Sequence, residues 1–203
     1  MSNTGSKPKA GDGHVEVTPG FRFTVRGFPV VLTRKFPFGL LLLVAMGWLL
    51  ANLGDNLRDD SSPVPNWSLR VFLAGLIFAT SVYVVILCHE AAHAVVASKF
   101  GYPPQWAKLG AVSAGVKLPR DPTGWARISI SAAGPLAEML CSLILITPSI
   151  TGSLIELLTA PTALAGLGMF INGAVGLIVP LGRRSDAAKI YRGIREIRRP
   201  ATT

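Results

Sequence analysis

Four apolar stretches, each long enough to cross the hydrocarbon core of a bilayer, constrain this 203-residue chain more than any other feature. A helix needs about 20 residues to cross that core. The stretches run over about 36–53, 71–98, 126–150 and 158–181. A segment within a bilayer must satisfy its own backbone hydrogen bonds, so each stretch is expected to be a helix. The sequence therefore predicts an all-α polytopic membrane protein with about four transmembrane helices.

The distribution of charged residues supports four spans and predicts the orientation of the chain in the membrane. Only 15% of residues are charged, although the net charge is +9. This composition argues against a soluble domain, a disordered chain and a nucleic-acid binder. With four spans, 18 of the 20 Lys and Arg residues lie on one side of the membrane. The positive-inside rule then places both termini in the cytoplasm, and no cleaved signal peptide is expected.

The segments outside the spans divide the chain into three parts. Residues 1–20 are expected to be a mobile cytoplasmic tail, 21–185 the membrane-embedded domain, and 186–203 a basic amphipathic segment on the cytoplasmic membrane surface. Phe21–Val25 alternates apolar and polar residues and predicts a short strand. A short β-strand or hairpin element, which includes the strand-like piece Ala111–Leu118, is expected between the second and third spans. Cys88 and Cys141 both fall within spans and are expected to be buried free thiols.

The second span ends in the sequence His89-Glu90-Ala-Ala-His93. Four residues make about one helical turn, so the two histidines share a face and can ligate one Zn²⁺. Glu90 is close enough to act as general base toward a water at that metal. Ionisable residues within a membrane are costly and indicate function by default. The alternatives are a polar cluster that holds helices together and a proton-relay pair.

A catalytic zinc site usually has three protein ligands, and the third is less evident. His14, the remaining histidine, lies in the N-terminal tail, and Glu156 is expected near the opposite membrane face. Asp186 follows a Pro-Gly interruption beginning at Pro180, which can turn the chain back toward the site. Spacing alone leaves two interpretations of Asp186 equally open: a metal ligand, or an ion-pair partner of the neighbouring arginines.

The third span carries Gly134-Pro135 followed one turn later by Glu138. A Gly-Pro pair within a membrane helix permits close packing or a kink. Glu138 is either a residue that faces the metal cavity or a protonated carboxyl hydrogen-bonded to a neighbouring helix.

Taken together, these motifs resemble the site-2 protease family of intramembrane zinc metalloproteases (peptidase family M50). The resemblance rests on the His89–His93 motif, on Ala133-Gly134-Pro135 in the next helix and on the Pro180–Asp186 element, and it covers about residues 25–195. It implies that His89, His93 and Asp186 hold one Zn²⁺ per chain, that Glu90 is the general base, and that the strand at 111–118 holds an extended substrate. It also implies a bacterial cell membrane.

Two residues depart from the family pattern. Glu138 stands where the family often has Asn, and Ala187 follows Asp186 where a Gly is common; Asn172, earlier on the fourth helix, is a candidate for a related role. The preferred hypothesis is a zinc-dependent intramembrane endopeptidase that cleaves membrane segments of protein substrates near the cytoplasmic face. The alternatives are an inactive zinc-binding membrane scaffold and a small proton-coupled transporter.

Overall fold

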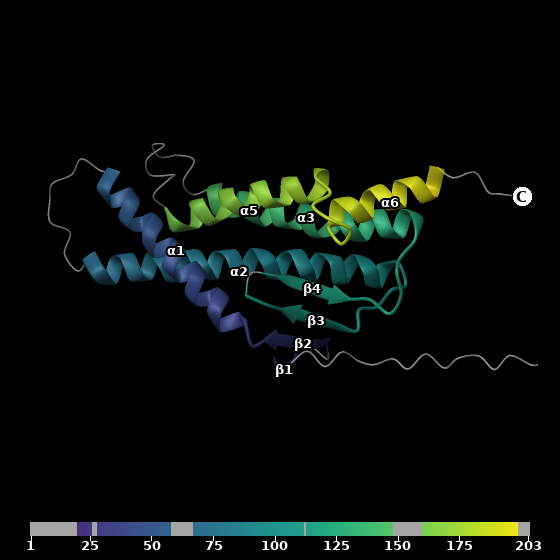
Figure 1. Ribbon diagram of the computed structural model, residues 1–203, viewed down its shortest axis with the longest axis horizontal. Coiled ribbons are helices and arrows are strands. Elements are labelled where there is room, and N and C mark those ends of the chain that lie inside the picture. Colours follow the sequence, from purple (N-terminus) through teal and green to yellow (C-terminus); the bar gives the residue numbers. More distant parts are fainter. Residues whose placement is uncertain (1–19, 26–27, 58–66, 112, 148–159, 199–203) are drawn as a thin grey trace, which may run out of the picture.

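The computed structural model describes residues 20–25, 28–57, 67–111, 113–147 and 160–198 (Figure 1). Within these ranges, four helices are long and apolar enough to cross a membrane: α1 (Phe36–Leu57), α2 (Trp67–Lys99), α3 (Gly124–Ile146) and α5 (Pro161–Ile178). The predicted helical membrane fold with four spans is therefore confirmed. The end of the third predicted span (148–150) and the start of the fourth (158–159) lie outside the described residues.

The fourth helix ends earlier than the apolar stretch that predicts it. α5 stops at Ile178, and Val179 is extended, with φ −100° and ψ 114°. The residue before a proline is driven out of the helical region by the proline ring, so Pro180 fixes this end. The chain then turns through Gly182, whose φ of 104° suits glycine.

The helices pack in a bundle with α2 and α3 at its centre. Figure 1 shows α1 lying obliquely across α2, and α3 beside α5. Small residues allow these close crossings, as is common between membrane helices. A Cβ on Gly75 of α2 would lie 2.5 Å from the Val44 carbonyl oxygen of α1, and one on Gly173 of α5 would lie 2.9 Å from the Pro135 carbonyl oxygen of α3.

Four short strands form one sheet beside the helices, in the order β1-β2-β3-β4. They are β1 (Gly20–Val25), β2 (Phe28–Thr33), β3 (Trp106–Leu109) and β4 (Ala114–Lys117). β2 and β3 pair in parallel, whereas the two outer pairs are antiparallel. β4 is an edge strand and lies against α2.

The strand predicted at the N-terminus is confirmed as β1, but the sheet is larger than the sequence indicates. The strand or hairpin expected between the second and third spans is present as the antiparallel pair β3–β4, with β4 inside the predicted piece Ala111–Leu118, whereas β2 was not predicted. β3 has only four residues, and its pairing with β2 joins segments separated by two membrane helices. Short strands with partners so far along the chain leave little local signal.

The last described element, α6 (Asp186–Arg198), is the predicted amphipathic helix. Its apolar side packs along α3, where a Cβ on Gly193 would lie 2.6 Å from Ile128. At its far end, Glu196 accepts hydrogen bonds from the Gly124 backbone N–H and from the Arg127 guanidinium. These contacts hold α6 alongside α3, beyond the end of α5 (Figure 1).

Candidate metal centre

The two histidines of the motif present their ring nitrogens to the same point. They lie one turn apart near the end of α2, and their Nε2 atoms are 3.0 Å from each other. His89 and His93 stand ten and six residues before Lys99, so they lie about 9–15 Å from the end of the helix at 1.5 Å per residue. The pair is therefore embedded in the bundle, near one of its ends.

The hydrogen bonds of the opposite ring nitrogens decide which nitrogens are free. His93 Nδ1 lies 2.6 Å from the Ile130 carbonyl oxygen, and His89 Nδ1 lies 2.7 Å from Glu138 Oε2. A carbonyl and a carboxylate only accept, so each Nδ1 carries the proton. In the neutral form of each ring the lone pair is then on Nε2, directed toward the other histidine, an arrangement typical of histidines that bind a metal.

Asp186 adds a third donor atom from a distant part of the chain. Its Oδ2 lies 3.4 Å from His89 Nε2 and 3.3 Å from His93 Nε2. Tetrahedral zinc bonds of about 2.0–2.1 Å place neighbouring ligand atoms about 3.3–3.4 Å apart. The three donor atoms have nearly this spacing, and three electron-pair donors in one place favour a cation between them. The donor set therefore fits Zn²⁺.

The electrostatics of Asp186 favour its ionised form. Burial by itself raises the pKa of this carboxyl, whereas the nearby positive charge of Lys189 lowers it, and the pKa lies well below its usual value. Lys189 Nζ donates to Asp186 Oδ1 at 3.0 Å. One carboxylate oxygen is thus fixed by lysine while the other remains directed at the histidines.

Gly134 of α3 lies directly against the two imidazoles. A Cβ at this position would be 2.6 Å from His89 Nε2 and closer still to His93 Nε2. The adjacent Pro135 is fully buried and faces α5, where Gly173 and Gly176 make room for it. The Gly-Pro pair therefore serves close packing on both sides of α3.

Glu138 lies behind the histidines instead of facing the cavity. Its side chain is buried to 1% exposure, its Oε2 contacts His89 Nδ1, and its Oε1 accepts a 2.7 Å hydrogen bond from Asn172 Nδ2. A carboxylate on the outer nitrogen of a metal-binding histidine fixes the ring and increases its basicity. Glu138 and Asn172, both candidates from the sequence, therefore lie at the site, but on the side of His89 away from the cavity. The sequence alone did not predict the contact between Glu138 and His89. Glu138 and His89 are 49 residues apart, so no local pattern joins them.

The donor atoms open into a cavity of about 660 Å³. Glu90 lines it together with both histidines, one wall is formed by Ala114–Leu118 of the sheet edge, and the other by residues 183–186 with the first turns of α6. The edge strand and the candidate metal ligands therefore share one cavity, which is large enough for a peptide side chain and main chain.

Fold and site together define an integral membrane protein in which a His-His-Asp group that could hold a metal opens into a cavity beside an edge strand. The protein is similar in structure to the site-2 protease from Methanocaldococcus jannaschii, with a TM-score of 0.58 over 90% of this chain and 74% of the other, at 18% sequence identity. No family profile and no curated protein sequence matches the chain. The chain has the fold of a site-2 protease, and the resemblance expected from its motifs is confirmed at that level.

Proposed function

We propose that this protein is a zinc-dependent intramembrane endopeptidase. The observation that supports it most directly is the convergence of His89 Nε2, His93 Nε2 and Asp186 Oδ2 within a membrane bundle of this fold. Zn²⁺ held by these atoms would supply Lewis-acid chemistry, lowering the pKa of a water and polarising a peptide carbonyl. The third ligand comes from α6, outside the spans, so the site requires the whole chain to be folded.

Glu90 is the proposed general base. It follows His89 on α2 and lines the same cavity as the histidines. Its carboxylate would accept a proton from the attacking water and deliver it to the nitrogen of the leaving amine. A carboxylate is the right group for both transfers because it can hold the proton between them.

The edge strand is the proposed substrate guide. β4 pairs with β3 on one side, and its residues line the cavity. A membrane segment unwound next to the metal site can add to this edge as an extended strand, with main-chain hydrogen bonds providing affinity. Local unwinding is required because the peptide bonds of a helix are shielded from attack.

The charges of the chain support the proposed orientation. The cavity opens near the end of α2 at Lys99 and beside the basic helix α6. By the positive-inside rule this end faces the cytoplasm, with both termini. The proposed cleavage then takes place near the cytoplasmic face of a cell membrane.

The position of Glu138 supports the protease over the inactive scaffold. A carboxylate at position 138 would repel a developing oxyanion if it faced the substrate. Glu138 does not line the cavity and is engaged by His89 and Asn172, so its charge is directed elsewhere. The departure from the family pattern at position 138 therefore does not argue against catalysis, whereas the departure at Ala187 remains.

Zinc content and cleavage test the proposal separately. Zinc per chain should be one in the wild type and fall in His93→Ala and Asp186→Asn, with Asp121→Asn as the matched control, because Asp121 lines the cavity without joining the donor atoms. Glu90→Gln should keep zinc and lose cleavage of a panel of membrane-segment fusion proteins. Stoichiometric zinc in a wild type that cleaves none of them would favour the scaffold, and unchanged zinc in Asp186→Asn would reject the third ligand.

A further inference from the structure

The cavity that holds the candidate metal centre carries an excess of positive charge. Among the described residues that line it, six are basic (Lys117, Arg127, Arg183, Arg184, Lys189 and Arg192) and three are acidic (Glu90, Asp121 and Asp186). Two of the acidic residues belong to the proposed metal and proton chemistry. Only Asp121 remains as an acidic side chain available to offset the basic ones.

Two of the basic residues are already paired. Arg127 forms an ion pair with Glu196, and Lys189 with Asp186. Lys117, Arg183, Arg184 and Arg192 make no ion pair with the described residues; Arg192 instead donates to the Arg183 carbonyl oxygen. That bond fixes the backbone of the loop between α5 and α6, so the loop arginines are presented from an ordered turn.

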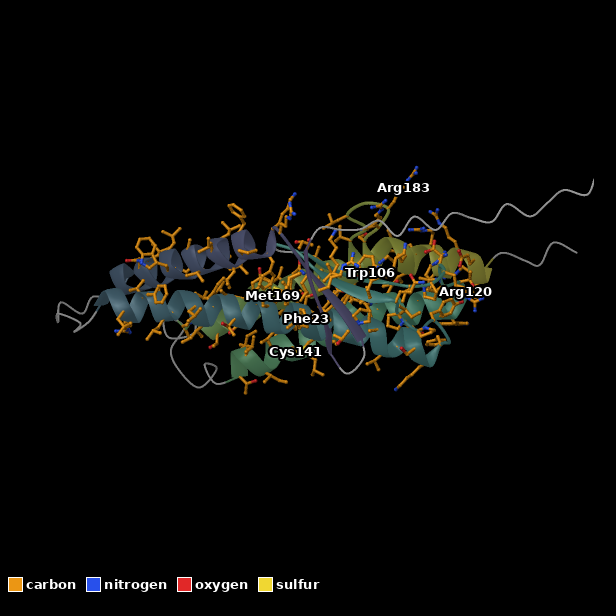
Figure 2. All side chains as sticks on the ribbon, turned by 90° about the horizontal axis from the view of Figure 1, so that it is seen from below. Phe23, Trp106, Arg120, Cys141, Met169 and Arg183 are labelled. Carbon is orange, nitrogen blue, oxygen red and sulfur yellow. The ribbon has the colours of Figure 1, made fainter. Side chains whose placement is uncertain are left out.

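These cations lie on both walls of the cavity. Lys117 ends β4 on one side, while Arg183 and Arg184 precede α6 on the other. Figure 2 shows Arg183 projecting outward from its loop. A peptide paired with β4 would pass between the two walls as it leaves the metal site. A cleft lined with one sign of charge concentrates its field along that path.

We call the four cations without an ion-pair partner among the described residues the basic mouth: Lys117, Arg183, Arg184 and Arg192. We propose that this basic mouth selects substrates by the charge of the segment flanking their membrane span, accepting an acidic flank and rejecting a flank rich in Lys or Arg. The inference rests on the proposed protease function and names its substrate class. Cytoplasmic flanks of membrane spans are normally enriched in Lys and Arg. Like charges brought together at an interface suppress wrong partners, so the mouth excludes most membrane proteins.

Anionic lipid headgroups are the competing ligand for these arginines. The acidic peptide is favoured because the four cations line the same cavity as the histidines and Glu90, and they come from both the sheet edge and the α5–α6 segment that border it. Other basic residues of α6, including Arg195 and Arg198, are exposed outside this lining and remain available to a membrane surface.

The test measures binding without cleavage. The Glu90→Gln variant, in phosphatidylcholine nanodiscs, is titrated with three fluorescent peptides that share one apolar segment and differ only in a flank of three Asp, three Ser or three Lys. The acidic peptide should bind about 10-fold more tightly than the basic one at low salt, and the difference should shrink at 0.3 M salt. The double substitution Arg183→Glu with Arg184→Glu should reverse the order.

A matched control keeps the result interpretable. Arg195→Glu with Arg198→Glu makes the same charge change on α6 outside the cavity and should leave the preference unchanged. Zinc content and size-exclusion profiles show that each variant is folded. Equal binding of the three peptides overturns the proposal. So does loss of the preference when the nanodiscs contain phosphatidylglycerol, because the arginines would then be bound to lipid headgroups.

The outcome is separable from that of the proposed function. A charge preference in binding, with no cleavage by the wild type, would reject the protease and keep the selective mouth. Cleavage of acidic and basic fusion proteins at equal rates would keep the protease and reject the mouth.

Discussion

Adding one methyl group at Gly134 is expected to abolish metal binding. A Cβ there would lie 2.6 Å from His89 Nε2, whereas ordinary van der Waals contact begins at 3.4 Å. The histidine must therefore move by about 0.8 Å, and His93 Nε2, which is nearer, by more. Metal sites tolerate deviations of only about 0.2 Å in ligand distance. At least one ligand is then lost.

The Gly134→Ala substitution has two separate effects, one on the stability of the protein and one on its affinity for zinc. Overpacking of this kind costs about 1–3 kcal/mol of stability. Loss of groups that merely orient a ligand lowers metal affinity about 10–100-fold, and displacing the ligands themselves should cost at least the upper end of that range. Gly134→Ala should therefore bind zinc at least about 100-fold more weakly and show no cleavage.

The assay compares Gly134→Ala with Gly168→Ala in a zinc-buffered chelator titration. Gly168 of α5 is a matched control because a Cβ there would meet nothing within 4 Å. Alanine favours a helix over glycine by about 1 kcal/mol, so the control should be neutral or slightly more stable. Circular dichroism verifies that both variants are folded. Wild-type zinc affinity in a folded Gly134→Ala variant would refute the geometry of the site.

Three further predictions concern the groups behind the ligands and the metal itself. Glu138→Gln should lower zinc affinity about 10–100-fold in the same titration, because one amide oxygen cannot accept from both His89 and Asn172; unchanged affinity would contradict the role of Glu138. The backbone hydrogen bond from Gly124 and the Arg127 guanidinium lower the pKa of Glu196, so the stabilisation it gives α6 is present at neutral pH and is lost as the carboxylate protonates. Thermal unfolding should therefore show a lower Tm for Glu196→Gln at pH 7, and the difference should shrink below pH 4.5; a constant difference would argue against the ion pair. Chelation should lower the wild-type Tm reversibly, since a ligand of the native state adds about 2.7 kcal/mol at 100 times its Kd, and Asp186→Asn should respond less.

The local parts of the site were predictable because their signals are local. The histidines of α2 lie one turn apart, and a four-residue repeat on a helix places two side chains on one face. Pro180 and Gly182 mark the turn that brings Asp186 back, and the basic residues after it predict α6. The sequence left Asp186 between a metal ligand and an ion-pair partner of Arg183 or Arg184. In the structure, one carboxylate oxygen lies near the histidines and the other pairs with Lys189 instead of an arginine.

The relations between helices were not predictable in the same way. Glu138 was recognised as costly in a membrane, but its contacts with His89 and Asn172 depend on how three helices cross. Gly134 was noted as a packing residue, and only the crossing of α2 and α3 places it against the imidazoles. The pairing of strands in the sheet was also not predictable. β2 and β3 pair although two membrane spans separate them in the sequence, and the sequence of a short strand does not indicate so distant a partner.

The sequence by itself determined that the chain crosses a membrane, how many times it does so among the described residues, and which turn of which helix carries the histidines. These follow from hydrophobicity and periodicity, which are properties of neighbouring residues. Only the tertiary structure decided that Asp186 lies beside the two histidines, that Glu138 contacts His89 from behind, and that the loop arginines line the same cavity as Lys117. These depend on the distances between separate helices, and those distances are set by side-chain packing over the whole bundle.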